Sequence, residues 1–152
     1  MFQVAFAFRR TSCIAVAVFV AMWLAPCIAR SQDESVESRI EHVAGLTASD
    51  VRKLLEDLKK RTASRNARAT CALVIYPLRI TGGTIKTIAE CEAGFDHIFN
   101  TKVTAAIKSQ RFEQLFVNWQ GVMVGSGEVW ISGVCPDKAC RTHSLGIINV
   151  NN

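Results

Sequence analysis

The stretch from Val117 to Cys135, VNWQGVMVGSGEVWISGVC, predicts the centre of the fold. Valine, isoleucine, methionine and tryptophan fill both flanks, and these residues favour a pleated, buried surface. A Gly-Ser-Gly run between the flanks supplies the positive φ angles of a tight hairpin, with Ser126 and Gly127 as its loop. The expected pairs are Val124 with Val129, Val122 with Ile131, and Met123 with Trp130. Both faces are apolar, so we expect a sheet that is covered on both sides.

The first residues predict a secretory signal peptide. Arg9 and Arg10 precede an apolar run from Cys13 to Ile28, and small residues stand near its end. We expect cleavage after Ala29, which removes residues 1–29 and sends the protein to the periplasm or the medium. One alternative is an uncleaved membrane anchor, although the run is shorter than the roughly 20 residues of a span. The other is a lipoprotein modified at Cys27.

The net charge of the chain excludes few classes of partner. The formal net charge is +5, and the two arginines of the leader contribute two of these charges. The basic segment Arg52–Arg68 is interpreted as the solvated face of a helix and its linker. Contact with an anionic lipid or a polyanion is the alternative, and we expect no nucleic-acid partner because the chain is exported.

Four cysteines remain after cleavage, and an even number in an exported domain favours disulfides. Several pairings are open, and we favour Cys71–Cys91 and Cys135–Cys140. The first would tie the start of a strand to the segment that enters the next helix. The alternative is a zinc site at Cys135, Cys140 and His143 with His97 or Cys91 as a further ligand. We expect the disulfides and no metal or cofactor.

The chain begins its folded part with helices. Residues 30–46 are polar and predict either a frayed tail or a short helix that carries Val36, Ile40 and Val43. A helix then runs from Thr47 to about Arg61, with a capping-box pattern at its start. Its apolar stripe contains Val51, Leu54, Leu55 and Leu58. Residues 62–70 predict a loop.

The rest of the chain alternates hairpins and helices. Residues 71–81 and 84–89 predict a hairpin, in which Pro77 marks either an edge or a bulge. Residues 90–110 are helical, with a break at Asn100-Thr101, and residues 145–150 form a last strand. This order predicts a single α+β domain over residues 47–152, with helices and a mostly antiparallel sheet.

Three segments carry a resemblance: Tyr76-Pro77-Leu78, Phe95 to Phe99, and LFVNWQGVMVGSGEVW at 115–130. They resemble a set of uncharacterised exported bacterial proteins that share Tyr-Pro-Leu and Asn-x-Gln-Gly-Val-Met-x-Gly-x-Gly-Glu-x-Trp. The resemblance covers residues 71–134. The order of elements is similar to the NTF2-like (cystatin-like) superfamily, in which a curved sheet wraps a helix. This likeness implies an N-terminal helix packed on a curved, mostly antiparallel sheet. That superfamily includes isomerases, dehydratases, transport factors and accessory domains, so the likeness implies a fold and no function.

The leading functional interpretation is a non-enzymatic exported domain. Such a domain would bind a partner protein, an envelope component or a small apolar ligand through one face of its sheet. Trp119, Met123 and Trp130 are the candidate contacts, because aromatic anchors dominate binding surfaces. Asn118 and Gln120 are the candidate polar neighbours.

Two alternatives remain. The first is a small-pocket enzyme, an isomerase, dehydratase or hydrolase, that uses Asp96, His97 or Glu128 as acid or base. Asp96 and His97 are adjacent on a helix and point in different directions. Tyr76 is the only tyrosine, and no oxyanion role is assigned to it. The second alternative is an inhibitor or immunity-type protein directed against an envelope enzyme.

Overall fold

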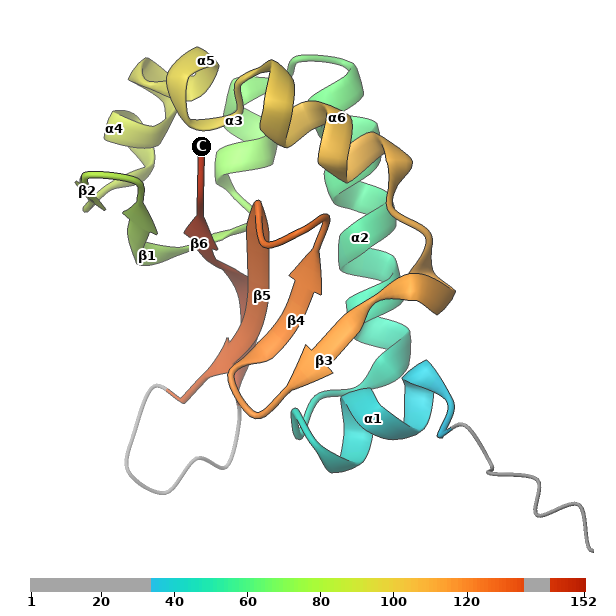
Figure 1. The fold of residues 1–152 in the computed structure, drawn as a ribbon. Coiled ribbons are helices and arrows are strands. Elements are labelled where there is room, and N and C mark those ends of the chain that lie inside the picture. The colour runs from blue at the N-terminus through green and yellow to red at the C-terminus, as the bar shows by residue number, and fades with distance from the viewer. Residues whose placement is uncertain (1–33, 136–142) are drawn as a thin grey trace, which may run out of the picture. The chain divides into compact units, whose positions relative to one another are not determined.

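The computed structural model describes residues 34–135 and 143–152, within a compact unit that spans Asp33–Asn152. Helices pack with an open sheet of six strands, and all strand pairs except one are antiparallel (Figure 1). The predicted α+β class is therefore confirmed. The predicted signal peptide, residues 1–29, lies outside the described residues. No helix in the described part of the chain is long and apolar enough to cross a membrane.

The first two helices form much of the core. Helix α1 (Val36–His42) is capped by the Ser35 side chain and buries Val36 and Ile40, so the helix alternative for residues 30–46 is the one observed. Helix α2 (Ala48–Ala63) buries the four residues of its predicted stripe: Val51, Leu54, Leu55 and Leu58. Thr47 occupies the N-cap of α2, but its side chain makes no capping hydrogen bond, so the predicted capping box is wrong.

The remaining helices are short. Helix α3 (Ala67–Cys71) lies in the predicted loop and begins where the Asn66 side chain accepts a hydrogen bond from a backbone amide, so the loop prediction is wrong. Helix α4 (Ile88–Ala93) ends the predicted strand 84–89 early, because Thr87 caps it. Helices α5 (Phe95–Ile98) and α6 (Thr101–Ser109) are separated at Asn100, as predicted. A 3₁₀ turn, η1 (Phe112–Gln114), follows.

The sheet has the order β2-β1-β6-β5-β4-β3 (Figure 1). Its strands are β1 (Val74–Ile80), β2 (Gly83–Ile85), β3 (Phe116–Asn118), β4 (Gly121–Val124), β5 (Val129–Val134) and β6 (Ser144–Val150). The exceptional pair, β1 with β6, is parallel. The β1–β6 register shifts between Val74 and Arg79, around Pro77, so the bulge alternative applies at this proline.

The central hairpin has the predicted register. Val122 pairs with Ile131, Met123 with Trp130, and Val124 with Val129. Its first arm differs from the prediction, because residues 116–124 form two strands instead of one. The chain turns at Trp119-Gln120, and this turn makes β3 the edge of the sheet.

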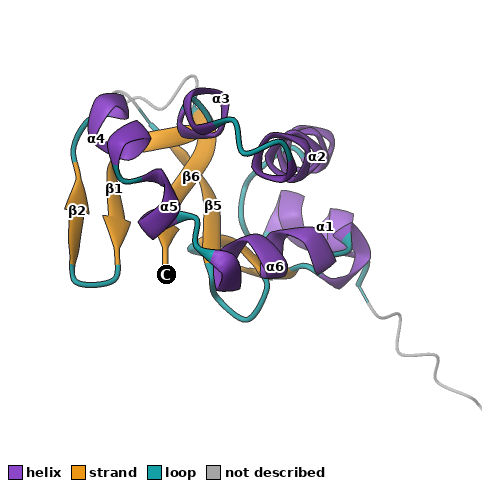
Figure 2. Cartoon of the chain, turned by 90° about the horizontal axis from the view of Figure 1, so that it is seen from above, coloured by secondary structure: helices purple, strands orange, loops and turns teal. Residues whose placement is uncertain are grey.

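The two faces of the sheet have different surroundings. One face carries Val122, Val124, Val129 and Ile131, which are fully buried in the same core cluster as the apolar residues of the helices. On the opposite face, Met123 and Trp130 are only half-buried. The prediction of a sheet covered on both sides is therefore wrong. Figure 2 shows the β1–β2 hairpin at one side of the unit, away from α1 and α2.

A disulfide joins Cys71 to Cys91, as predicted, and both residues are fully buried. Because Cys71 ends α3 and Cys91 lies in α4, the bond ties two helices across the β1–β2 hairpin rather than a strand to a helix. Cys135 is also disulfide-bonded. Its predicted partner, Cys140, lies outside the described residues.

Candidate binding surface on the open sheet face

The strand register aligns six residues into a single row across the sheet. Phe116 pairs with Met123, Met123 with Trp130, and Trp130 with Asn149. Asn149 then pairs with Arg79, and Arg79 with Thr84. Paired residues project from the same face of a sheet, so these six side chains share the half-exposed face. We call Phe116, Met123, Trp130, Asn149, Arg79 and Thr84 the cross-strand row; it crosses about 24 Å, because neighbouring strands lie about 4.8 Å apart.

The cross-strand row has an apolar half and a polar half. Phe116, on the edge strand β3, is 48% exposed, and the half-buried Met123 and Trp130 continue the apolar half over β4 and β5. The polar half, from Asn149 to Thr84, borders a hollow of about 480 Å³ that Trp130 also lines. A ligand on this face therefore meets an apolar platform beside a polar hollow.

Trp119 lies in the turn between β3 and β4 and is 80% exposed. The turn is held by Asn118, whose side-chain oxygen accepts a hydrogen bond of 2.8 Å from the backbone amide of Gln120. Gln120 lines the same hollow as Trp130. Of the predicted contact residues, Met123 and Trp130 are thus neighbours on one face, while Trp119 and Gln120 lie at the end of the adjoining hairpin.

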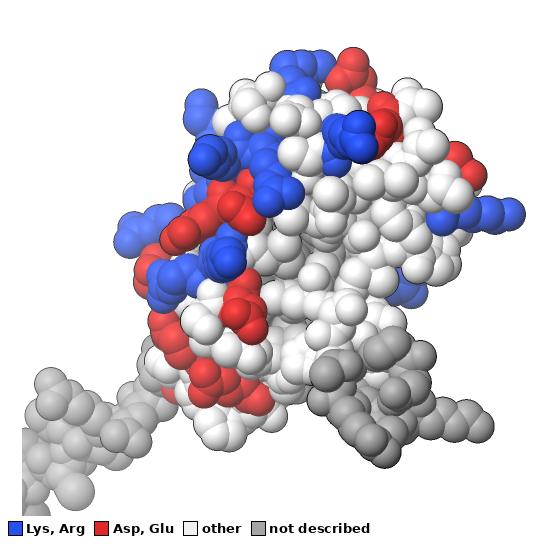
Figure 3. All heavy atoms as spheres, turned by 180° about the vertical axis from the view of Figure 1, so that it is seen from behind, with Lys and Arg blue, Asp and Glu red and all other residues white. Residues whose placement is uncertain are grey.

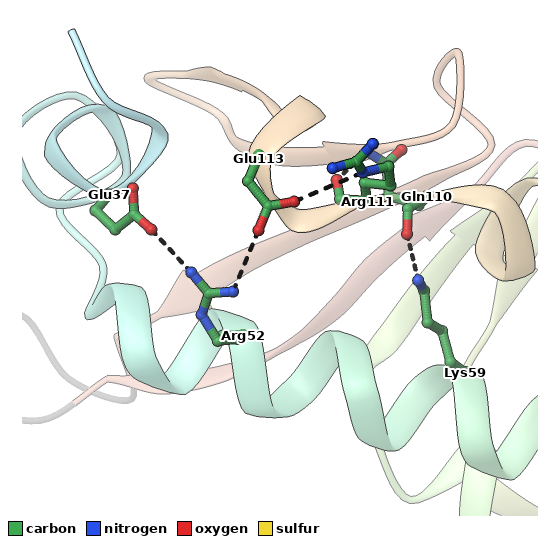
Figure 4. Close-up of polar contacts among 6 residues, drawn as sticks. All are labelled: Glu37, Arg52, Lys59, Gln110, Arg111 and Glu113. Atoms are coloured by element: carbon green, nitrogen blue, oxygen red, sulfur yellow. Dashed lines mark hydrogen bonds and ion pairs between the residues drawn. The ribbon is translucent and has the colours of Figure 1, made fainter.

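A cluster of charges fixes the approach to the edge strand β3 (Figure 4). Arg52, on α2, lies 2.8 Å from Glu37 of α1 and 3.6 Å from Glu113 of η1. Its guanidinium also stacks 3.6 Å from the centre of the Phe112 ring. The pKa of the Glu113 carboxyl is lowered chiefly by a hydrogen bond from the backbone of Glu113 itself. The positive charges of Arg111 and Arg52 lower it further. Two helices therefore hold η1, which leads through Leu115 into Phe116.

Gln110 connects the end of α6 to the central hairpin and is buried. Its side-chain oxygen accepts a hydrogen bond of 2.7 Å from the Gly125 amide in the β4–β5 turn, and its side-chain nitrogen donates to the Arg111 carbonyl. Lys59 of α2 donates to the Gln110 backbone carbonyl (Figure 4). Glu128 supports the same turn by accepting a hydrogen bond from the Ser126 amide. Gln110 was not singled out by the sequence, since a lone glutamine after a helix has no distinctive pattern.

The candidate acid–base residues do not assemble into an enclosed site. Asp96 and His97 are exposed on the rim of a hollow that Arg65 and Glu92 also line. Asp96 forms an ion pair of 2.5 Å with Arg65, and Glu128 is engaged in its turn. Neither Asp96 nor His97 is shielded from water, and a pocket that tunes a general base needs such shielding.

Tyr76 has a structural contact. Its hydroxyl donates a hydrogen bond of 3.0 Å to the Cys71 carbonyl. Burial, reinforced by the charge of Glu92, raises the pKa of Tyr76 to about 12. The phenol therefore stays protonated at neutral pH and fastens β1 to the end of α3, next to the Cys71–Cys91 disulfide.

The zinc alternative involves Cys140, which lies outside the described residues. Within residues 34–135 and 143–152, the structure brings no three histidine, cysteine or acidic side chains together as a metal site. Because Cys135 is disulfide-bonded, its sulfur is not a thiolate ligand in this state.

Only two of the six row residues, Met123 and Trp130, were predicted from the sequence. Phe116, Arg79 and Asn149 join the row only through strand pairing, and the parallel β1–β6 pair that brings Arg79 beside Asn149 has no local signal. Ile148 lines the hollow because the register of β6 shifts beside Trp130 and Ile131.

No family model matches the chain, and no curated protein or solved structure is significantly similar to it. The likenesses to the exported bacterial set and to the NTF2-like superfamily therefore stay predictions.

Proposed function

We propose that this protein is an exported, non-enzymatic binding domain whose cross-strand row contacts a partner protein in the cell envelope. The observation that carries the proposal is the chain of paired residues from Phe116 to Thr84, which places three large apolar side chains on a partly exposed face. The predicted signal peptide and the Cys71–Cys91 disulfide support export, because disulfides persist in oxidising compartments.

The composition of the surface favours a protein as the partner. Aromatic residues, methionine and arginine are enriched at protein interfaces, and the apolar core of an interface is surrounded by a polar rim. The row has an apolar part, with Met123 and Trp130, and a polar border on one side, with Asn149 and Arg79. Trp119, at 80% exposure, adds an aromatic side chain that the fold itself does not bury.

Arg79 indicates the charge of that partner. It is exposed and forms no ion pair with another described residue. A carboxylate on the partner would meet the guanidinium in a bidentate pair, which is geometrically specific. We therefore expect the partner to present an apolar side chain to Trp130 and an acidic side chain to Arg79.

Site-specific photo-crosslinking tests this proposal. A photoreactive residue placed at Met123 in exported protein is expected to capture a partner, which is then purified and titrated. The matched control position is Ile88 on α4, which is apolar and 41% exposed but belongs neither to the row nor to the lining of its hollow. Equal crosslinking from both positions contradicts a specific surface. A small apolar ligand, seen as extra mass in a native spectrum without any crosslinked protein, also contradicts it.

Titration of variants with the purified partner then tests which residues of the surface contact it. Trp130→Ala is expected to weaken binding by about thirtyfold, the loss typical of a hot-spot residue. If Trp130→Ala instead unfolds the domain, Trp119→Ala becomes the test of the surface. The Trp119 side chain is too exposed to support the core, so this variant stays folded. Arg79→Glu is expected to weaken binding through charge repulsion, whereas Ile88→Ala leaves it unchanged. Unchanged affinity in both Trp119→Ala and Arg79→Glu would refute the proposed surface.

A further inference from the structure

A second surface lies away from the sheet face, in a groove between α2 and α6. These helices contact each other, and the groove between them has a volume of about 680 Å³. This volume is in the range of small-molecule sites. Its walls carry cations, and small side chains such as Ala63 of α2 and Ala105 of α6 lie between them. We call this feature the α2–α6 groove.

The groove carries unsatisfied positive charge. Lys59, Lys60, Arg65 and Lys108 line it, against a single acidic residue, Glu56. Arg65 pairs with Asp96 and Lys59 donates to the Gln110 carbonyl. Lys60, on α2, and Lys108, on α6, make no hydrogen bond or ion pair with another described residue. Two ammonium groups are therefore available to an anion in the groove.

The charges along α2 are not a uniform basic field. Figure 3 shows that Lys and Arg side chains along the side of α2 alternate with Asp and Glu, while the centre of that face is uncharged. A polyanion needs a continuous line of cations, which α2 interrupts with Glu56 and Asp57. The groove instead offers cations beside methyl-bearing small side chains.

We propose that the α2–α6 groove binds a fatty-acid carboxylate, with the head group at Lys60 and Lys108 and the acyl chain over Ala63 and Ala105. The carboxylate gains two charge-assisted contacts. The chain removes apolar surface from water on both partners, which is favourable in proportion to the area buried. The part of α2 that lines the groove, Glu56–Ala63, extends about 12 Å, enough to lie along much of an extended acyl chain. This inference is independent of the proposed protein partner, because it uses none of the row residues.

Calorimetric titration of the purified full chain with dodecanoate, below its micelle concentration, tests the inference. We expect saturable binding with one site. Dodecan-1-ol is expected to bind more weakly because it lacks the charge, and acetate not to bind detectably because it lacks the chain. Equal affinity for dodecanoate and dodecan-1-ol, or for dodecanoate and acetate, overturns the proposed two-part recognition.

Variants locate the site. The double variant Lys60→Ala/Lys108→Ala is expected to lose about tenfold in affinity for dodecanoate, the combined effect of two exposed charge contacts. The matched control Arg68→Ala/Lys86→Ala removes the same charge from exposed side chains outside the groove. An equal loss in the control overturns the site, because net charge alone then explains it.

A third variant tests the apolar part. Ala105→Phe fills the groove without changing its charge, and the exposed position keeps the fold intact. We expect weaker binding of dodecanoate with an unchanged melting temperature. Undiminished binding in Ala105→Phe places the chain elsewhere and overturns the proposal.

Discussion

Removing the Cys71–Cys91 disulfide should destabilise the domain by a predictable amount. The bond spans a sequence separation of 20 and encloses the whole β1–β2 hairpin. In the chain-entropy model, a cross-link of this span lowers the entropy of the unfolded chain by about 11 cal/mol/K, equivalent to about 3.3 kcal/mol at 25 °C. This is a large share of the roughly 5–15 kcal/mol that stabilises a typical domain.

The double variant Cys71→Ala/Cys91→Ala measures this contribution with the least added disturbance. Both cysteines are fully buried, so alanine leaves only a small void and introduces no polar atom. We expect its free energy of unfolding in urea to fall by about 3 kcal/mol. Cys71→Ser/Cys91→Ser should lose more, since each buried hydroxyl without a partner adds about 1–3 kcal/mol.

The outcome separates an entropic cross-link from a packing role. Tryptophan fluorescence, to which the half-buried Trp130 contributes, and circular dichroism should report the same transition if unfolding is two-state. A loss below about 1 kcal/mol for the alanine pair would refute the loop-closure reasoning, because the unfolded chain would then gain little freedom. An equal loss for the alanine and serine pairs would refute the assigned burial.

Three further predictions follow from local contacts. Gly121 has φ +132°, and an added Cβ would stand 2.2 Å from a β5 carbonyl oxygen, so Gly121→Ala should lower the melting temperature more than Gly82→Ala, whose site at φ +80° is open. Gln110→Leu leaves the Gly125 amide without its acceptor and should cost about 1–3 kcal/mol in urea unfolding. Tyr76, the only tyrosine, should form phenolate near pH 12 when folded and near pH 10 in urea, so stability falls as pH rises from about 10 to 12.

The features that the sequence predicts correctly are local and periodic. The apolar stripe of α2 repeats at helical spacing, and the four residues that define it are all buried. The glycines of the β4–β5 turn restrict where the hairpin can turn, and this position fixes the strand register. The predicted pair of Met123 with Trp130 is therefore correct to the residue. In both elements the decisive signal lies within about twenty residues.

The features that the sequence misses depend on short caps or on distant pairing. Helix α3 has only five residues, too few for an apolar period, and its one signal was the capping Asn66. The turn at Trp119-Gln120 contains no glycine or proline, although Gly121 follows it with a positive φ. The parallel pairing of β1 with β6 joins segments about seventy residues apart, for which a single sequence carries no register information.

The exposed face could not be assigned from the hairpin alone, because both of its faces are apolar. A half-solvated antiparallel sheet normally alternates apolar and polar residues. β4 and β5 depart from this rule where they carry Met123 and Trp130, while the buried valines and isoleucines of the opposite face already supply the core. An apolar platform that the core does not require is unfavourable in water unless another surface covers it. This departure is the physical reason to look for a partner on the sheet face rather than for a reaction at Asp96 and His97.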